Sequence, residues 1–109
     1  AAFPATREMT VAVYNRPMRF EVEYVDEVGI HMIRFTDHRI EWTEQVRDAD
    51  GLIVGMVDLD ADGAPVDVEI LSLEHFPLDT CAATYGFADH AGAIGIALGA
   101  AEHRQAARR

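Results

Sequence analysis

Hydrophobic and polar residues alternate with a period of two through most of residues 18–76, which is the pattern of half-buried β-strands. In the first clear example, Phe20, Val22 and Tyr24 alternate with charged residues. Further strands are predicted over 30–36, 40–47, 52–57 and 66–73, with turn-forming residues between them. The spacing of these turns predicts an antiparallel β-meander of about five strands.

Two of these segments carry more specific expectations. The segment 52–57 is apolar on both faces, which predicts a central strand covered on both sides. In the segment 40–47, Ile40, Trp42 and Val46 share one face, and Glu44 falls on that apolar side.

From residue 77 onward the period changes to that of helices. A short helix is predicted over 79–84 with Gly86 as its left-handed stop, and a longer helix over 89–107. The apolar side of the longer helix would consist of Ile94, Ala97, Leu98 and Ala101.

The other side of the longer helix is rich in glycine, which costs about 1 kcal/mol per residue relative to alanine in a helix interior. Such a cost is offset where a backbone must approach a sheet or a partner helix closely. The predicted interface residues are Gly92, Gly95, Ile96 and Gly99.

These patterns predict an α+β protein with three parts. Residues 1–17 form an N-terminal arm or edge strand, and residues 18–76 form the β-meander domain. Residues 77–109 form a C-terminal helical extension, packed on the sheet or on a partner.

Composition narrows the classes of partner. The formal net charge of -10 argues against nucleic acid, which requires clustered basic residues. The longest apolar run, 91–101, is too short to span a bilayer, and no signal peptide is visible. Cys81 is the single cysteine, which fits a reducing cytoplasm.

The stretch 58–69 matches the calcium-loop pattern D-x-[DN]-x-[DN]-G-x5-E, with Gly63 at the turn. The metal ligands would be Asp58, Asp60, Asp62 and Glu69. However, both flanks have strand patterns rather than helix patterns, Pro65 has no N–H to pair with a sister loop, and no second loop is present. The preferred interpretation is a hairpin turn, with a weak calcium site as the alternative.

Four motifs carry a resemblance to a known family: Y-x-D at 24–26, M-I-R-F-T-D at 32–37, D-L-D-A-D-G at 58–63 and V-E-I-L at 68–71. In this order they resemble a family of small bacterial proteins catalogued only as a domain of unknown function. Its members follow a Y-D, L-Y-I-R-L, D-x-D-x-x-G, G-I-E-I-L succession. The likeness covers residues 19–73, and its specific part runs from D-x-D-x-x-G to E-I-L.

The resemblance implies a β-meander whose last two strands are joined at 60–63, and it implies no established catalytic activity. Because some relatives are thought to sit beside genes for small ribonuclease-like toxins, it also suggests an antitoxin-like partner of a small basic toxin. The chain departs from the family pattern at His31, where an aliphatic residue is usual, and at Asp67, where glycine is usual.

Catalytic chemistry has little support in the sequence. The histidines at 31, 38, 75, 90 and 103 lack the spacing of metal sites, and His31 is expected in the core. Glu44 and Glu69 would form a proton-transfer site only if they were buried near each other or near His31. Cys81 is expected to be a small buried hydrophobe.

The sequence therefore predicts no enzyme and no required cofactor. The leading hypothesis is a non-enzymatic protein–protein interaction or oligomerisation module, a small subunit or scaffold of a larger assembly in a bacterial cytoplasm. The alternatives are the acidic calcium-binding hairpin and the antitoxin-like partner of a basic toxin.

Overall fold

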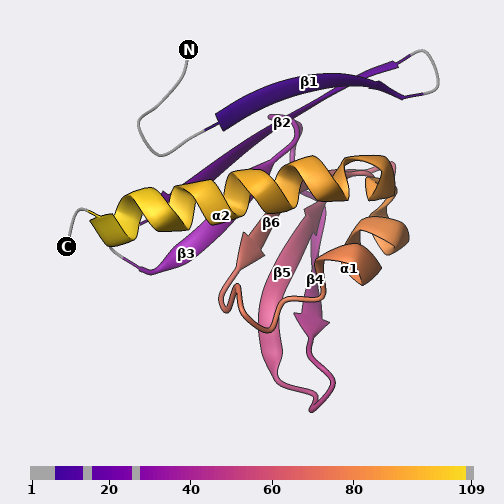
Figure 1. The fold of residues 1–109 in the computed structure, drawn as a ribbon. Helices are drawn as coiled ribbons and strands as arrows, with labels where there is room; N and C mark the ends of the chain where they lie inside the picture. Colours follow the sequence, from indigo (N-terminus) through magenta and orange to yellow (C-terminus); the bar gives the residue numbers. More distant parts are fainter. Residues whose placement is uncertain (1–6, 14–15, 26–27, 108–109) are drawn as a thin grey trace.

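The computed structural model describes residues 7–13, 16–25 and 28–107, which form one antiparallel sheet with helices on one face (Figure 1). The strands are β1 (Arg7–Val13), β2 (Arg16–Val25), β3 (Ile30–Arg34), β4 (Trp42–Arg47), β5 (Ile53–Leu59) and β6 (Pro65–Ile70). They precede helix α1 (Leu78–Tyr85), a 3-10 turn η1 (Ala88–His90) and helix α2 (Ala91–Ala107). The predicted α+β class, with one short and one longer C-terminal helix, is confirmed.

The strand order is β1-β2-β3-β6-β5-β4, so two three-stranded meanders meet where β3 pairs with β6. The predicted run of consecutive hairpins is thus interrupted once, and part of the N-terminal arm pairs with β2 as an edge strand. The segment 35–41 carries the chain across the sheet from β3 to β4. Its ends are held by hydrogen bonds from Phe35 N to Val66 O (2.9 Å) and from Glu41 N to Leu59 O (2.8 Å).

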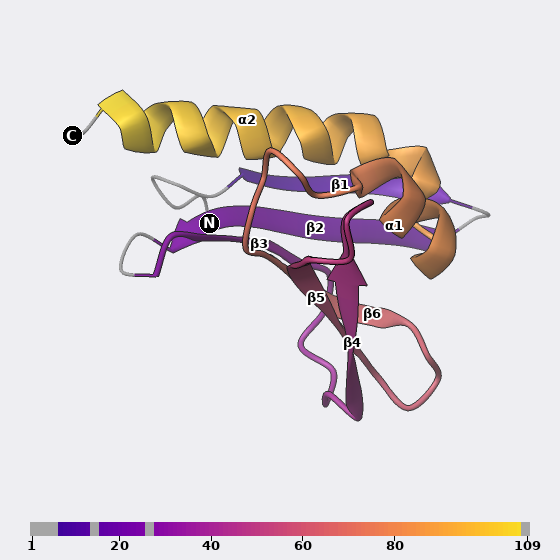
Figure 2. The same ribbon diagram turned by 90° about the horizontal axis from the view of Figure 1, so that it is seen from below.

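One face of the sheet forms the core. Fully buried side chains on this face come from four adjacent strands: Phe20, Val22, Ile33, Val57, Val68 and Ile70. They form one buried cluster with the apolar side of α2, where Ile94, Ala97, Leu98 and Ala101 are all buried as predicted. Figure 2 shows α2 lying along this side of the sheet, over β1 and β2.

The other face, called the open face from here on, consists of the residues that alternate with the core residues. Across the sheet these are Glu21, Glu23, Val25, Ile30, Met32, Arg34, Asp67, Glu69, Met56, Asp58, Thr43 and Gln45. None of them belongs to the core cluster, nor do Ile53 and Leu71, which continue this face at the ends of β5 and β6. No helix of the described chain covers this face.

Two predictions about strands are wrong. The segment 52–57 is not covered on both sides, because Ile53 is 40% exposed and Met56 lies on the open face. In the segment 40–47 only Val46 packs against the core, and Trp42 is 46% exposed at the sheet edge. The apolar pattern identified strands correctly but did not specify which of their faces would be covered.

The helix ends follow the sequence more closely. Gly86 ends α1 in the left-handed conformation, with φ 86°, and its N–H donates to Ala82 O. The start of α1 differs from the prediction: the helix begins after Pro77, without a side-chain cap, and not at Asp79. Among the described residues, no helix is long and apolar enough to cross a membrane.

At Gly55 the sheet and the segment leading to α1 approach each other closely. A Cβ atom at this position would lie 2.5 Å from Phe76 Cε1 and 2.6 Å from the backbone oxygen of Glu69. The backbone contact cannot be relieved by rotating a side chain. Glycine is therefore required here by packing, in contrast to Gly99 on α2, where an added Cβ would meet nothing within 4 Å.

We predict that Gly55→Ala lowers the free energy of unfolding by about 1–3 kcal/mol, because it overpacks a filled core. The matched control, Gly99→Ala, should raise it by about 0.5–1 kcal/mol, because alanine favours the helix and has room. Urea unfolding measures both changes. Equal stabilities of Gly55→Ala and the unchanged protein would contradict this account of the packing.

Candidate functional site

The candidate calcium loop is a β-hairpin. Its turn is organised by Asp60, which is 7% exposed. Asp60 Oδ1 accepts hydrogen bonds from the backbone N–H groups of Asp62 (2.9 Å) and Ala64 (3.0 Å), and Gly63 has φ 80°. The preferred interpretation of this stretch as a hairpin turn agrees with the structure, and no helix flanks it.

Asp60 also joins the hairpin to the segment that crosses the sheet. His38, in segment 35–41, donates from Nδ1 to Asp60 Oδ2 at 3.1 Å. The hydrogen bond from His38, followed by the backbone hydrogen bond from Ala64, lowers the pKa of Asp60 below its usual value. Both oxygens of Asp60 are thus committed to structural hydrogen bonds.

The predicted ligand set divides into two groups. Asp58 and Glu69 lie on the open face, and the third acid beside them is Asp67, with one oxygen of each lying within 4.8 Å of the others. Asp60 and Asp62 stay in the turn and do not join them. Asp67 was missed as a candidate because the calcium pattern does not include its position.

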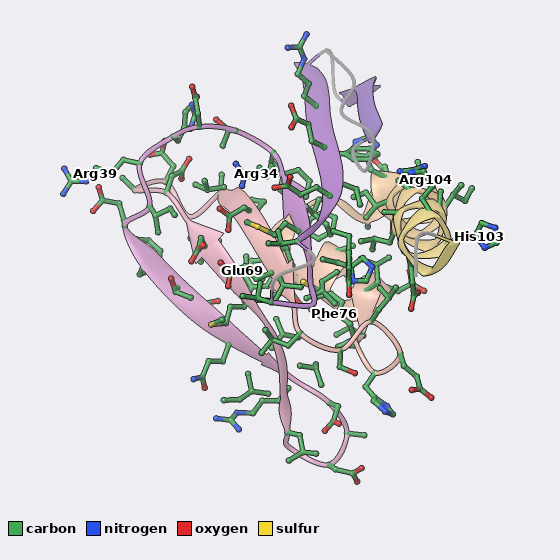
Figure 3. The ribbon with its side chains drawn as sticks, turned by 90° about the vertical axis from the view of Figure 1, so that its left-hand side faces the viewer. Arg34, Arg39, Glu69, Phe76, His103 and Arg104 are labelled. Atoms are coloured by element: carbon green, nitrogen blue, oxygen red, sulfur yellow. The ribbon has the colours of Figure 1, made fainter. Side chains whose placement is uncertain are left out.

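The acidic triad, meaning Asp58, Asp67 and Glu69, is electrostatically strained. Burial, a hydrogen bond with Asp58 and the negative charges of Asp58 and Glu69 raise the pKa of Asp67 to about 7, against a smaller opposing effect of Arg34. The Thr43 hydroxyl donates to Asp58, while Asp67 Oδ1 is buried with no hydrogen-bond partner among the described residues. Arg34, labelled with Glu69 in Figure 3, forms an ion pair with Glu23 at 3.0 Å.

The triad offers three carboxylates on a sheet surface, whereas calcium takes six to eight oxygen ligands. It therefore differs from the predicted site in both its members and its geometry. Calcium binding stays a prediction.

The groups considered for proton transfer do not meet. His31 faces the core and is 4% exposed, Glu69 lies on the open face, and Glu44 accepts a hydrogen bond from Tyr85 Oη at 2.5 Å. Burial lowers the pKa of His31, against a smaller opposing effect of Glu102. His31 is a core residue, as expected.

Cys81 is also where the sequence placed it, in the short helix and 3% exposed. Burial raises the pKa of its thiol to about 12, so the sulfur stays protonated and weakly nucleophilic at neutral pH.

Three of the four predicted interface residues of α2 lie on the side of the helix that faces away from the sheet, and Gly95 is half-buried beside α1. Gly92, Ile96 and Gly99 are exposed, and Ile96 is 68% exposed. An added Cβ at Gly92 or Gly99 would meet nothing within 4 Å, and one at Gly95 would lie 3.6 Å from Leu78 Cδ2. Packing within the described chain therefore requires none of these three glycines.

Comparison with known proteins adds no assignment: no protein-family model, no curated protein and no solved structure matches the chain. The resemblance to the bacterial family of unknown function stays a prediction.

The triad predicts a specific pH dependence. Because the pKa of Asp67 is raised above 3.8, Asp67 binds more protons in the folded protein than in the unfolded chain between about pH 4 and pH 7, and its contribution to stability falls as pH rises through this window. Asp67→Asn removes this charge and retains a donor for Asp58. We expect the variant to gain about 1 kcal/mol over the unchanged protein at pH 8, allowing for solvent screening, and less at pH 4.

Urea midpoints measured from pH 4 to pH 8 test this expectation. Glu74→Gln is the control, because it removes one charge from a side chain that is 86% exposed and outside the triad. Parallel pH profiles for Asp67→Asn and the unchanged protein would show that Asp67 is an ordinary surface carboxylate.

Proposed function

We propose that the chain is a non-enzymatic interaction module of the cytoplasm, which pairs with a second copy through the outer face of α2. The observation that carries this proposal is the set of glycines at 92, 95 and 99, which packing within the described chain does not require. Each glycine makes helix formation about 1 kcal/mol less favourable than alanine would. Close packing of a second helix against this side would explain why glycines stand here, because they let the two backbones approach each other. The unpaired Cys81 supports a reducing compartment.

The exposed residues of α2 have the spacing of a helix-pairing seam. Gly92, Ile96, Gly99 and His103 follow one another at intervals of four, three and four residues, and all four are exposed. This is the a/d spacing with which helices pack side by side. Figure 3 shows His103 projecting from α2 on the side away from the sheet.

The seam is self-complementary in shape. Ile96 projects as a knob, and the glycines one turn to either side leave hollows. A groove of about 540 Å³ opens between the starts of α1 and α2, where Gly92 and Gly95 have no side chains to fill it. A two-fold axis through Ile96 would set the two Ile96 side chains side by side at the crossing point, with the hollows at Gly92 and Gly99 of each copy next to them, as an isologous interface allows.

Polar side chains at the two ends of the seam agree with an antiparallel arrangement of the two helices, because aspartate accepts and histidine can donate a hydrogen bond. Asp89 lies seven residues before Ile96 and His103 seven residues after it, and both are exposed. A two-fold axis at Ile96 would therefore place Asp89 of one copy opposite His103 of the other, at both ends of the seam. One 17-residue helix offers a small interface, so we expect a weak dimer with a dissociation constant on the order of 10 μM.

Two substitutions on the seam test the pairing. Ile96→Arg should abolish the dimer, because it places two like charges on the two-fold axis. The matched control, Ala83→Arg on the exposed side of α1, should leave it intact. Sedimentation equilibrium between 5 and about 500 μM distinguishes the two results, and a concentration-independent monomer for the unchanged chain would rule out the proposal.

Gly99→Ala provides a second test that separates folding from association. The variant should unfold at higher urea than the unchanged protein and yet dimerise at least tenfold more weakly, since its new methyl groups hold the helices apart. Unchanged dimerisation would mean that α2 is not the contact.

A further inference from the structure

The open face has an apolar half that the fold leaves uncovered. Its residues come from four adjacent strands and their ends, with Ile53 brought to this face by the register shift between β4 and β5: Val25, Ile30, Met32, Ile53, Met56 and Leu71. Ile53 is 40% exposed and Leu71 42% exposed, and the others are half-buried. The patch spans about 14 Å across the strands, since neighbouring strands lie about 4.8 Å apart.

The acidic triad lies next to this patch, along the same strands. Glu69 sits between Met32 and Met56 in the cross-strand register, and Asp67 and Asp58 follow one step further along the strands. Because all of these residues lie on paired strands, backbone hydrogen bonds fix the acidic residues relative to the apolar ones. The face presents a rigid apolar half and a rigid acidic half.

The arginines of this face leave the triad without a full counter-charge. Arg34 forms an ion pair with Glu23, and Arg47 donates to the Gly51 carbonyl and to Gln45. Arg19, near the start of β2, lines the same pocket as Arg34 and Asp67. The raised pKa of Asp67 agrees with a cluster whose negative charge Arg34 offsets only in part.

The charge of the face decides which occupant fits. A second copy laid on the open face would bring its acidic half against an equally acidic surface, and an anionic membrane or nucleic acid would meet the same repulsion. A basic partner with an apolar side can bury that side on the apolar half of the open face and pair its cations with the acidic half. Methionine side chains adapt to varied apolar surfaces, which suits Met32 and Met56 to such a contact.

Backbone pairing decides how the partner must bind. β3, β6 and β5 each have a hydrogen-bonded neighbour on both sides, so their N–H and C=O groups are not available for an added strand. Contact with this face is made through side chains. An amphipathic helix supplies such a contact, with apolar residues on one side and cations at its border.

We propose that the open face is a docking surface for a basic amphipathic helix of another protein. The apolar side of that helix covers the patch of Val25, Ile30, Met32, Ile53, Met56 and Leu71, and an arginine or lysine at its border pairs with the acidic triad. This surface is separate from the outer face of α2, so it does not depend on self-association. The bound state is a sheet with helices on both faces.

The probe is a synthetic 18-residue helix with leucine on one side and arginine on the other, compared with a peptide of the same composition in scrambled order. Titration into the ¹⁵N-labelled full chain should shift amide signals of β3, β5 and β6 more than those of α2. The amphipathic peptide should bind at least tenfold more tightly than the scrambled peptide. Equal binding of the two peptides, or shifts centred on α2 or β4, would overturn the proposal.

Variants locate the contact independently. Leu71→Arg should weaken binding of the amphipathic peptide at least tenfold, and Glu69→Gln several-fold with a smaller dependence on salt. The matched control, Ile96→Arg on α2, should bind the peptide as the unchanged chain does. Unaltered binding by a folded Leu71→Arg variant would refute the docking surface, as would a loss of dimerisation in that variant, since the face would then be a contact between copies.

Discussion

The structure depends on the packing of one apolar side of α2 against one face of the sheet. Ile94, Ala97, Leu98 and Ala101 are buried against strands whose inward residues, such as Phe20 and Val22, are also fully buried. Complete burial of a large aliphatic or aromatic side chain stabilises a fold by about 1.5–3 kcal/mol, so this layer contributes most of the stability. Because the helices cover only one face of the sheet, the outer side of α2 and the open face are both left for other contacts.

A second constraint fixes the order of the strands. The chain leaves β3 in the middle of the sheet and must reach the far edge before β4 begins. The contact of His38 with Asp60 holds the crossing segment to the β5–β6 hairpin, and the same carboxylate organises that hairpin turn. The acid at the centre of the calcium-like pattern therefore serves the topology. Of the other acids in this stretch, Asp62 lies in the turn, and Asp58, Asp67 and Glu69 lie together on the open face.

Local patterns in the sequence were sufficient to predict the strands and helices but not to predict how the strands are arranged in the sheet. The two-residue period found the strands, and the left-handed preference of Gly86 found the end of α1. The pairing of β3 with β6 could not be predicted, because the alternation of residues within a strand does not specify which non-consecutive strands become neighbours. The exposure of Trp42 was missed for a related reason: an apolar residue on a strand face does not reveal whether a helix reaches far enough to cover it.

The acidic triad, by contrast, could have been predicted from strand alternation, but the calcium-loop pattern pointed to other residues. Asp58 and Glu69 lie on the two strands of one hairpin, and the period of two places Asp67 on the same face as Glu69. A search by strand face would have found the three acids together, whereas the calcium pattern selected Asp60 and Asp62 from the turn. Assigning residues to faces in the same way distinguishes the exposed side of α2, which contains Gly92 and Gly99, from its buried side.

The proposed function depends most on the pairing of α2 helices about Ile96. The direct measurement is site-specific disulfide cross-linking in solution, with Ile96→Cys compared with Ala83→Cys, both at exposed helical positions. Two helices that cross at Ile96 bring the introduced thiols within reach of a disulfide, so mild oxidation should convert most of the Ile96→Cys protein to a covalent dimer and little of the Ala83→Cys protein. Equal, slow cross-linking at both positions would contradict the pairing.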